Sequence, residues 1–247
     1  MTHRTRTTVL VFLLLLLVPL AVSGLTRLPA FGHYQGPYGD VINTITVHAR
    51  HVTNMVSAVN YDIRGFDTLG EEFLLMSAVT GVAMLLRGGR GEATSARPTR
   101  VLRRRREGRS EAITGIGRLL APITLLYGIY IIVHAQLTPG GGFQGGVIVF
   151  AAALLVYFGE GYASWRKTVR STMLTLGETL GAAIYLCSGL YPLLSGAAFL
   201  QNTLPLGQIG TITSGGSIPI INLGVGCAVA AGFCSIALEL LEETRLP

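Results

Sequence analysis

Charged residues are scarce in this chain of 247 residues. Only 13% of the positions are Asp, Glu, Lys or Arg, whereas an ordinary soluble domain carries roughly 25%. Hydrophobic residues make up 50% of the sequence, and the mean hydropathy is +0.53. A composition this poor in charge excludes an ordinary soluble domain and predicts an integral membrane protein.

The sequence also lacks the signatures of redox, hydrolytic and nucleotide-binding sites. Its three cysteines, Cys187, Cys227 and Cys234, lie inside apolar stretches, where a thiol behaves as a small hydrophobic group. They form no CxxC pair and show no metal-ligand spacing. A phosphate-binding glycine loop and a nucleophile elbow are absent as well. We therefore expect no cofactor, no metal and no enzymatic activity of the chain by itself.

Long apolar stretches are abundant. Five of them approach the length of about 20 residues that crosses a bilayer: 8–26, 118–137, 145–163, 173–196 and 220–241. A sixth, at 72–86, is shorter, so it is either an interfacial or re-entrant piece or a full span completed by the residues before it. The predicted fold class is an all-α integral membrane protein with about six transmembrane helices.

The first apolar stretch has two interpretations. Arg4 and Arg6, followed by the run "VLVFLLLLLV" and the small residues Ala21 and Ser23, are typical of a cleavable signal peptide. A length of about 19 residues, however, is sufficient for a retained membrane span.

Positive charge is concentrated between the apolar stretches at 72–86 and 118–137. Nine arginines fall between positions 87 and 109, which predicts a basic linker over 89–111 between two membrane modules, 1–88 and 112–247. Because cytoplasmic segments are rich in Arg and Lys, we expect the linker and both termini to be cytoplasmic. This orientation places 16 of the 19 Lys and Arg inside. It explains the pI of about 9.5 without nucleic acid, and the linker is expected to contact anionic lipids.

The first module, with about two helices, contains a polar segment before its second span. Val52, Met55, Val56 and Val59 recur at helical spacing and predict an amphipathic helix over 46–60. Gly65 and Gly70 are expected to break the helix. A capping-box pattern of Thr68 and Glu71 then predicts the start of the next one.

Ionisable side chains near or inside membrane spans are candidates for an ion path. They are Asp62, Arg64, Asp67, Glu71, His134 and Glu178. The first four form either a hydrated relay or a structural ion-pair cluster. His134 is alternatively a hydrogen-bonded structural residue, and Glu178 alternatively snorkels or pairs with Arg170 or Lys167.

The second module, with about four helices, contains the glycine-rich stretch "LTPGGGFQGGVIVF" at 137–150. Pro139 is expected to end the preceding helix. Gly140, Gly141 and Gly142 permit unusual backbone angles or close helix approach, and Gly141 is expected to need one or the other. The stretch is therefore either a tight external hairpin or a loop packed deep against a partner subunit.

Two motifs resemble known families. "HAQLTPGGGFQGGVI" resembles the glycine motif of the B subunit of Mrp-type multisubunit cation/proton antiporters and its equivalent in membrane-bound hydrogenases; the matching residues are His134, Pro139, Gly140, Gly141, Gly142, Phe143, Gly145 and Gly146. "VNYDIRGFDTLGEE" resembles the end of the antiporter A subunit and the E subunit of membrane-bound hydrogenase, through Asp62, Arg64, Asp67 and Glu71.

The resemblance implies a subunit of a prokaryotic cell-membrane complex related to the membrane arm of respiratory complex I. Its implied partners are other antiporter or hydrogenase-type membrane subunits, and the implied transported ions are H⁺ and Na⁺ or another cation. A subunit of a redox-driven pump and a purely structural scaffold are the alternatives. Asn222 stands where many antiporter B subunits have an acidic residue, a departure that leaves the coupling partner open.

Overall fold

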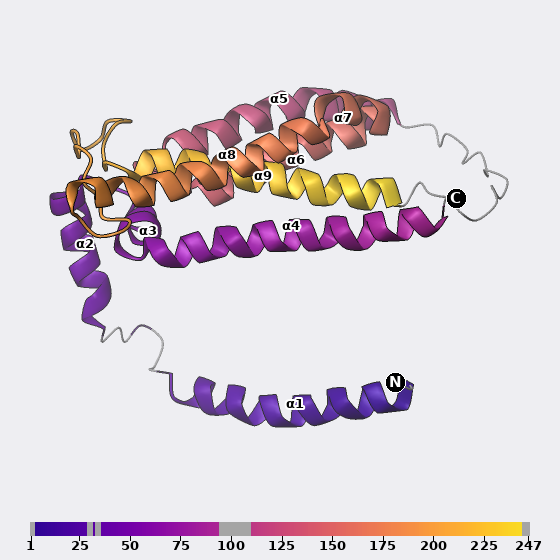
Figure 1. The fold of residues 1–247 in the computed structure, drawn as a ribbon, viewed down its shortest axis with the longest axis horizontal. Coiled ribbons are helices and arrows are strands. Elements are labelled where there is room, and N and C mark those ends of the chain that lie inside the picture. The colour runs from indigo at the N-terminus through magenta and orange to yellow at the C-terminus, as the bar shows by residue number, and fades with distance from the viewer. Residues whose placement is uncertain (1–2, 29–31, 33–35, 94–109, 244–247) are drawn as a thin grey trace. The chain divides into compact units, whose positions relative to one another are not determined.

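The computed structural model describes residues 3–28, 32, 36–93 and 110–243. The regular elements among them are helices (Figure 1), in chain order α1 (His3–Thr26), α2 (Pro37–Arg50), α3 (Met55–Ala58), a π-helical turn (Val59–Ile63), α4 (Gly65–Ala93), α5 (Glu111–Val133), α6 (Gly142–Glu160), α7 (Tyr162–Thr168), α8 (Ser171–Leu190), a 3₁₀ turn (Tyr191–Ser195) and α9 (Ile218–Glu243).

Six helical segments are long and apolar enough to cross a membrane: Thr7–Thr26, Gly65–Leu86, Glu111–Val133, Gly142–Glu160, Ser171–Ser195 and Ile218–Glu243. The predicted all-α fold with six spans is therefore confirmed. The short stretch at 72–86 belongs to a helix long enough to cross a membrane, because α4 begins seven residues earlier.

The chain divides into two units, residues 1–41 and residues 42–247. In the first unit, α1 contains the apolar span Thr7–Thr26, and none of this span is buried. Most of the predicted basic linker, residues 94–109, lies outside the described residues, and so do the lipid contacts expected of that stretch. On its N-terminal side, α4 continues as a helix to Ala93.

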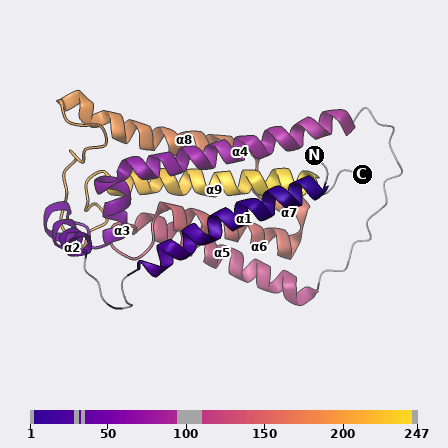
Figure 2. The same cartoon turned by 90° about the horizontal axis from the view of Figure 1, so that it is seen from below.

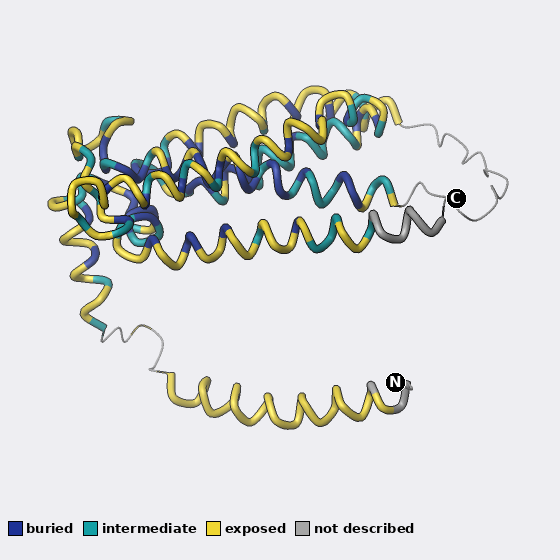
Figure 3. The backbone as a smooth tube through the Cα atoms, viewed as in Figure 1, coloured by how far each residue is buried: buried dark blue, intermediate teal, exposed yellow. Residues whose placement is uncertain are grey.

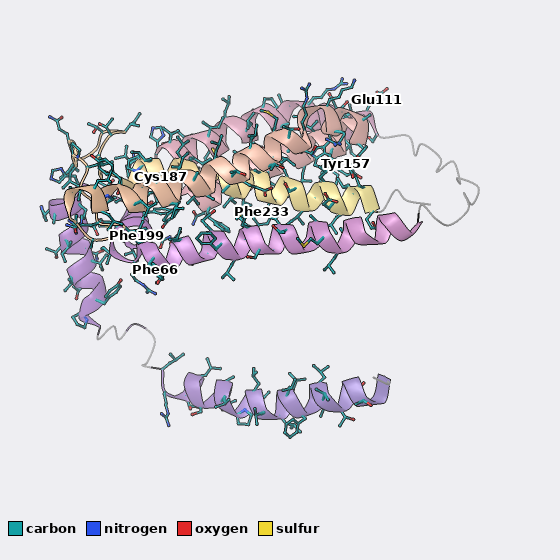
Figure 4. All side chains as sticks on the ribbon, viewed as in Figure 1. Phe66, Glu111, Tyr157, Cys187, Phe199 and Phe233 are labelled. Carbon is teal, nitrogen blue, oxygen red and sulfur yellow. The ribbon has the colours of Figure 1, made fainter. Side chains whose placement is uncertain are left out.

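Helix α9 is the centre of the second unit. It contacts α4, α5, α6 and α8, and 56% of its span is buried, against 17–28% for those four helices. Figure 2 shows α9 between α4 and α6, and Figure 3 shows the buried residues concentrated along it. Figure 4 marks Phe233 of α9, whose ring lies 5.6 Å from that of Phe150 in α6.

Small residues allow these helices to approach closely. A Cβ atom added to Gly117 of α5 would lie 2.9 Å from the Cα of Gly159 in α6, and one added to Gly181 of α8 would lie 2.7 Å from the Cβ of Ala228 in α9. Apolar side chains gain little by leaving lipid, so close packing of small residues is the main attraction between membrane helices. The glycines therefore position the spans that surround α9.

The predicted amphipathic helix over 46–60 is wrong. Helix α2 ends at Arg50, His51 takes a left-handed φ of 55°, and a new helix starts at Met55. Asn54 caps that start, because its side-chain oxygen accepts hydrogen bonds from the backbone N–H groups of Val56 and Ser57. The apolar periodicity continued across this break and concealed it.

The predicted start of the second span is also wrong. Arg64, with φ −127°, lies outside helical geometry, and α4 begins at Gly65 and passes through Gly70 without interruption. Thr68 is buried inside the first turns of α4, so the Thr68–Glu71 pattern does not cap a helix. Asp67 lies in the first turn, where the positive end of the helix dipole favours an acidic side chain.

Candidate functional site

The glycine-rich loop packs against residues of its own chain. The side-chain Nδ2 of Asn54 donates to the carbonyl oxygens of Ala135, Thr138 and Gly140 at 2.6, 2.8 and 2.9 Å. The backbone N–H groups of Thr53 and Asn54 both donate to the carbonyl of Gln136 at 3.2 Å. The start of α3 thus holds the turn between α5 and α6 in place. Sequence reasoning missed Asn54, since nothing along the chain links it to a loop 80 residues away.

The start of α6 packs tightly against α9. The backbone N–H of Gly142 donates to Oδ1 of Asn222 at 2.7 Å. A Cβ on Gly142 would collide with the carbonyl oxygen of Asn222, and one on Gly146 would lie 2.8 Å from the Cβ of Val229. Asn222 is therefore a cap for α6, a role that needs only a hydrogen-bond acceptor.

The other motif residues have separate positions. Gly140 has a φ of +127°, whereas Gly141 is extended at 176°, and a Cβ on Gly141 would meet first the flexible tip of Gln144. Phe143 packs edge-on against Phe233 with ring centroids 6.5 Å apart, and a Cβ on Gly145 would collide with Ile132. Pro139 is exposed in the turn.

His134 lies where α5 ends and the glycine-rich loop begins. Its ring stacks on that of Tyr130 at 4.1 Å, and its Nδ1 lies 3.1 Å from the Tyr130 carbonyl oxygen. These contacts suit a structural residue at the end of α5.

The predicted acidic cluster is divided into separate groups. Asp62 pairs with Arg50, the end residue of α2, at 2.6 Å, and its side chain is 4% exposed. Arg64 pairs with Asp67, with 2.7 Å between Nε and Oδ2, and both are exposed. Glu71 is exposed on α4. The four residues therefore do not converge on one point.

Burial raises the pKa of Asp62 above its ordinary value of 3.8, while the charge of Arg50 and a hydrogen bond from Asn202 lower it. Because the pKa is higher in the folded chain, ionisation of Asp62 opposes folding. The contribution of Asp62 to stability is therefore fully present below pH 3.8 and is lost as the pH rises through the pKa of the folded chain.

Arg50→Gln should therefore destabilise the chain at neutral pH by about 1–2 kcal/mol, less than a fully buried pair, because the Arg50 side chain is 39% exposed. The loss should shrink as the pH falls and Asp62 takes up a proton, because a neutral Asp62 leaves no charge for Arg50 to pair with. The measurement is the temperature at which the chain dissociates from the solubilised complex. Arg50→Gln combined with Asp62→Asn should recover most of the loss; a double variant as unstable as the single one would contradict the pairing.

Three other carboxylates lie at the seam between α4, α8 and α9. Glu72 is 7% exposed, and its Oε1 is buried without a hydrogen-bond partner. Glu178 is half-buried and accepts a hydrogen bond from Ser235 of α9, not from Arg170 or Lys167. Glu239 is 3% exposed. Of these, sequence reasoning identified only Glu178.

The three carboxylates line two cavities. A narrow one, of about 10 Å³, is lined by Glu72, Glu178 and apolar or small side chains. A wide one, of about 410 Å³, is lined by Glu178, Ser235, Glu239 and residues of α4 and α8. Glu178 and Val79 line both, so the two cavities adjoin. This pair of cavities, the α4–α8–α9 seam, is the best candidate for a functional site among the described residues.

Comparisons with known proteins agree with the fold. A protein-family model for a domain related to the MnhB subunit of Na⁺/H⁺ antiporters matches residues 113–235. The uncharacterised protein MJ1307 of Methanocaldococcus jannaschii is 29% identical over 238 residues, which cover 90% of this chain and 89% of that protein.

Two solved structures are similar over nearly the whole chain. A chain of the membrane-bound sulfane sulfur reductase, an archaeal respiratory membrane complex, is 30% identical with a TM-score of 0.72, and the match covers 96% of this chain and 98% of that one. A chain of the Mrp complex from Dietzia sp. DQ12-45-1b is 21% identical with a TM-score of 0.70. The match covers 97% of this chain but 26% of that one, so it shows the fold alone.

Proposed function

Because the chain belongs to the family related to the MnhB subunit of Na⁺/H⁺ antiporters, we propose that it is a membrane subunit of a multisubunit cation/proton antiporter and contributes to Na⁺/H⁺ exchange. Its partners are then other membrane subunits of the antiporter type, and its place is the cell membrane of a prokaryote.

One observation carries this proposal. Glu72 is a buried carboxylate with an unpartnered oxygen at a cavity between membrane spans. A charged side chain inside a membrane costs a few kcal/mol, so such residues usually mark ion or proton routes. A scaffold would need no carboxylate at this point, since an apolar side chain would pack there without that cost.

A second candidate function is that of a membrane subunit in a redox-driven ion pump. The observation that favours it is the 30% identity, over nearly full length, to a chain of an archaeal respiratory membrane complex. In such a complex, the same seam would move ions only while another subunit transfers electrons.

The two functions can be distinguished in everted membrane vesicles of the native host. The vesicles are prepared from cells in which the chain has been deleted and from cells in which it has been restored. A proton gradient is imposed by ammonium dilution, and NaCl is then added without any electron donor. For an antiporter, deletion should slow the Na⁺-induced collapse of the gradient at least tenfold. A response that appears only with an electron donor favours the pump, and unchanged responses in both conditions contradict both functions.

The proposal includes an orientation with both termini cytoplasmic, supported by the arginine bias of the sequence. A cysteine at Thr203, in the loop before α9, should react with an impermeant reagent added to intact cells, and one at Ser95 should not. The reverse pattern would contradict the orientation.

A further inference from the structure

The two cavities of the α4–α8–α9 seam differ sharply in volume. The wide cavity reaches from Glu239, near the C-terminal end of α9, to Glu178. The narrow cavity continues from Glu178 to Glu72 and has room for about one water molecule. Along α4, Glu72 and Val79 are seven residues apart, which is about 10 Å of helix. The seam thus narrows from a cavity of about 410 Å³ to one that holds about one water molecule and is lined by the buried carboxylate of Glu72.

The lining of the narrow cavity decides which ion suits it. Apart from the two carboxylates, its walls are Leu75, Met76, Val79, Ala182, Ala228 and Gly232. A dehydrated metal cation needs several oxygen ligands to replace its water, and these walls present side chains that supply none. A proton needs only one water and two carboxylates, because it moves as a bond exchange between neighbouring oxygens.

We propose that the α4–α8–α9 seam is a proton-uptake route, in which Glu239 and Glu178 line the wide cavity and Glu72 is the proton acceptor at the narrow one. In the uptake step, a hydronium ion passes its proton through Glu178 and one water to Glu72. An O–H bond forms on the Glu72 carboxylate, and the hydronium becomes water. The cation exchanged for the proton travels elsewhere in the complex. This inference rests on the proposed function in one respect, namely that Na⁺ is the ion whose movement drives proton uptake.

The groups around Glu72 fit an acceptor. Titratable side chains near it are Glu71 on its own helix, Tyr61 from the π-helical turn, and Tyr185 and Glu178 from α8. From α9 the cavity receives Ala228 and Gly232, which carry no charge. Neither α8 nor α9 brings a Lys or Arg to this cavity, so binding a proton is the way in which Glu72 becomes neutral.

The test uses the assembled complex in proteoliposomes with a pH dye inside. Glu72→Gln should lower the maximal rate of Na⁺-driven proton movement at least tenfold and leave the KM for Na⁺ within twofold, with normal abundance of the complex on native gels. Glu160→Gln is the matched control. This carboxylate lies at the end of α6, pairs with Arg118 at 2.8 Å and lines neither cavity, so the rate should stay within twofold.

An unchanged rate in Glu72→Gln would overturn the route, and so would a raised KM for Na⁺ with an unchanged maximal rate, since that result places the cation at Glu72. If the wild-type complex shows no Na⁺-driven flux, the proposed antiport fails and the route is tested alone. Proton uptake is then driven by a potassium diffusion potential, and Glu72→Gln should again reduce it at least tenfold.

A second measurement does not depend on Glu72. Ser77 and Thr80 lie one turn apart on α4, and each donates its hydroxyl to the carbonyl four residues earlier, but only Thr80 lines the wide cavity. In freeze–thawed vesicles, Thr80→Cys should react with a charged methanethiosulfonate at least tenfold faster than Ser77→Cys, with the wild-type chain as background. Equal rates would show that the cavity is not filled with water and would overturn the proposal.

Discussion

Gly142→Val is expected to remove most of the chain from its complex. A side chain at position 142 would collide with the carbonyl oxygen of Asn222 and approach the Cβ of Val225 to 2.9 Å and the N–H of Gly226 to 3.0 Å. Two of these neighbours are backbone of α9, so the helices must separate, at a loss of about 3 kcal/mol or more. Separation also breaks the 2.7 Å hydrogen bond from the Gly142 N–H to Asn222. The measurement is abundance of the chain in membranes and in the native-gel band.

Two controls isolate the close approach. Gly70→Ala changes a glycine within α4 where an added Cβ meets no atom within 4 Å, so abundance should be unchanged or slightly raised. Gly141→Ala introduces a Cβ whose nearest contact is the flexible amide of Gln144 at 2.9 Å, and abundance should fall only slightly. A Gly142→Val chain as abundant as Gly70→Ala would contradict the packing of α6 on α9.

The glycine motif shows how far a local pattern can be interpreted. The sequence predicted that glycine permits close helix approach in this stretch, and it does so at Gly142, Gly145 and Gly146. The expectation for Gly141 was wrong, because this residue is extended and faces a flexible side chain. Which glycine touches a neighbour depends on the rotation of α6 against α9, and that rotation is a tertiary property.

The number and type of spans were predictable for a different reason. Each span must be apolar over about 20 residues and must satisfy its own backbone hydrogen bonds in lipid. Both requirements are met within one continuous segment, so the sequence of that segment is sufficient to predict it. The breaks between the helices are not local. The interruption at 51–54 depends on a 2.6 Å contact between His51 and the carbonyl of Gly207 and on loop carbonyls that Asn54 binds.

Glu71 was predicted as an ion-path candidate and Glu72 was not, because the sequence places both residues equally at the polar end of a span. The helical stripe of buried residues Thr68, Leu69, Glu72 and Val79 does distinguish them, since it places Glu72 on the packed face and Glu71 outside it. The partner of Asp62 was not predictable. Arg64 is nearer in sequence, but the break after α2 brings Arg50 to Asp62 instead.

Asn54→Ala is expected to lower the stability of the chain by about 3 kcal/mol. Its amide has two hydrogens, which are shared among the carbonyls of Ala135, Thr138 and Gly140, while its oxygen caps α3. Loss of the cap contributes about 1 kcal/mol, and each carbonyl left without a donor about 1 kcal/mol or more. The Ala135 carbonyl keeps a donor in the hydroxyl of Ser57 at 2.6 Å, so two carbonyls lose their only side-chain partner.

Asn54→Asp separates the two roles of Asn54. The carboxylate still accepts hydrogen bonds from the N–H groups at the start of α3, but it no longer donates to the carbonyls of the glycine-rich loop. Its negative charge also faces three carbonyl oxygens, so this variant should be at least as unstable as Asn54→Ala. Ser57→Ala, which removes one of two donors to the Ala135 carbonyl, should cost only about 1 kcal/mol. Thermal loss of the chain from the solubilised complex ranks the three variants. If Asn54→Asp is as stable as the wild type, only the cap of α3 contributes to stability here. The glycine-rich loop between α5 and α6 is then held by contacts other than those with Asn54.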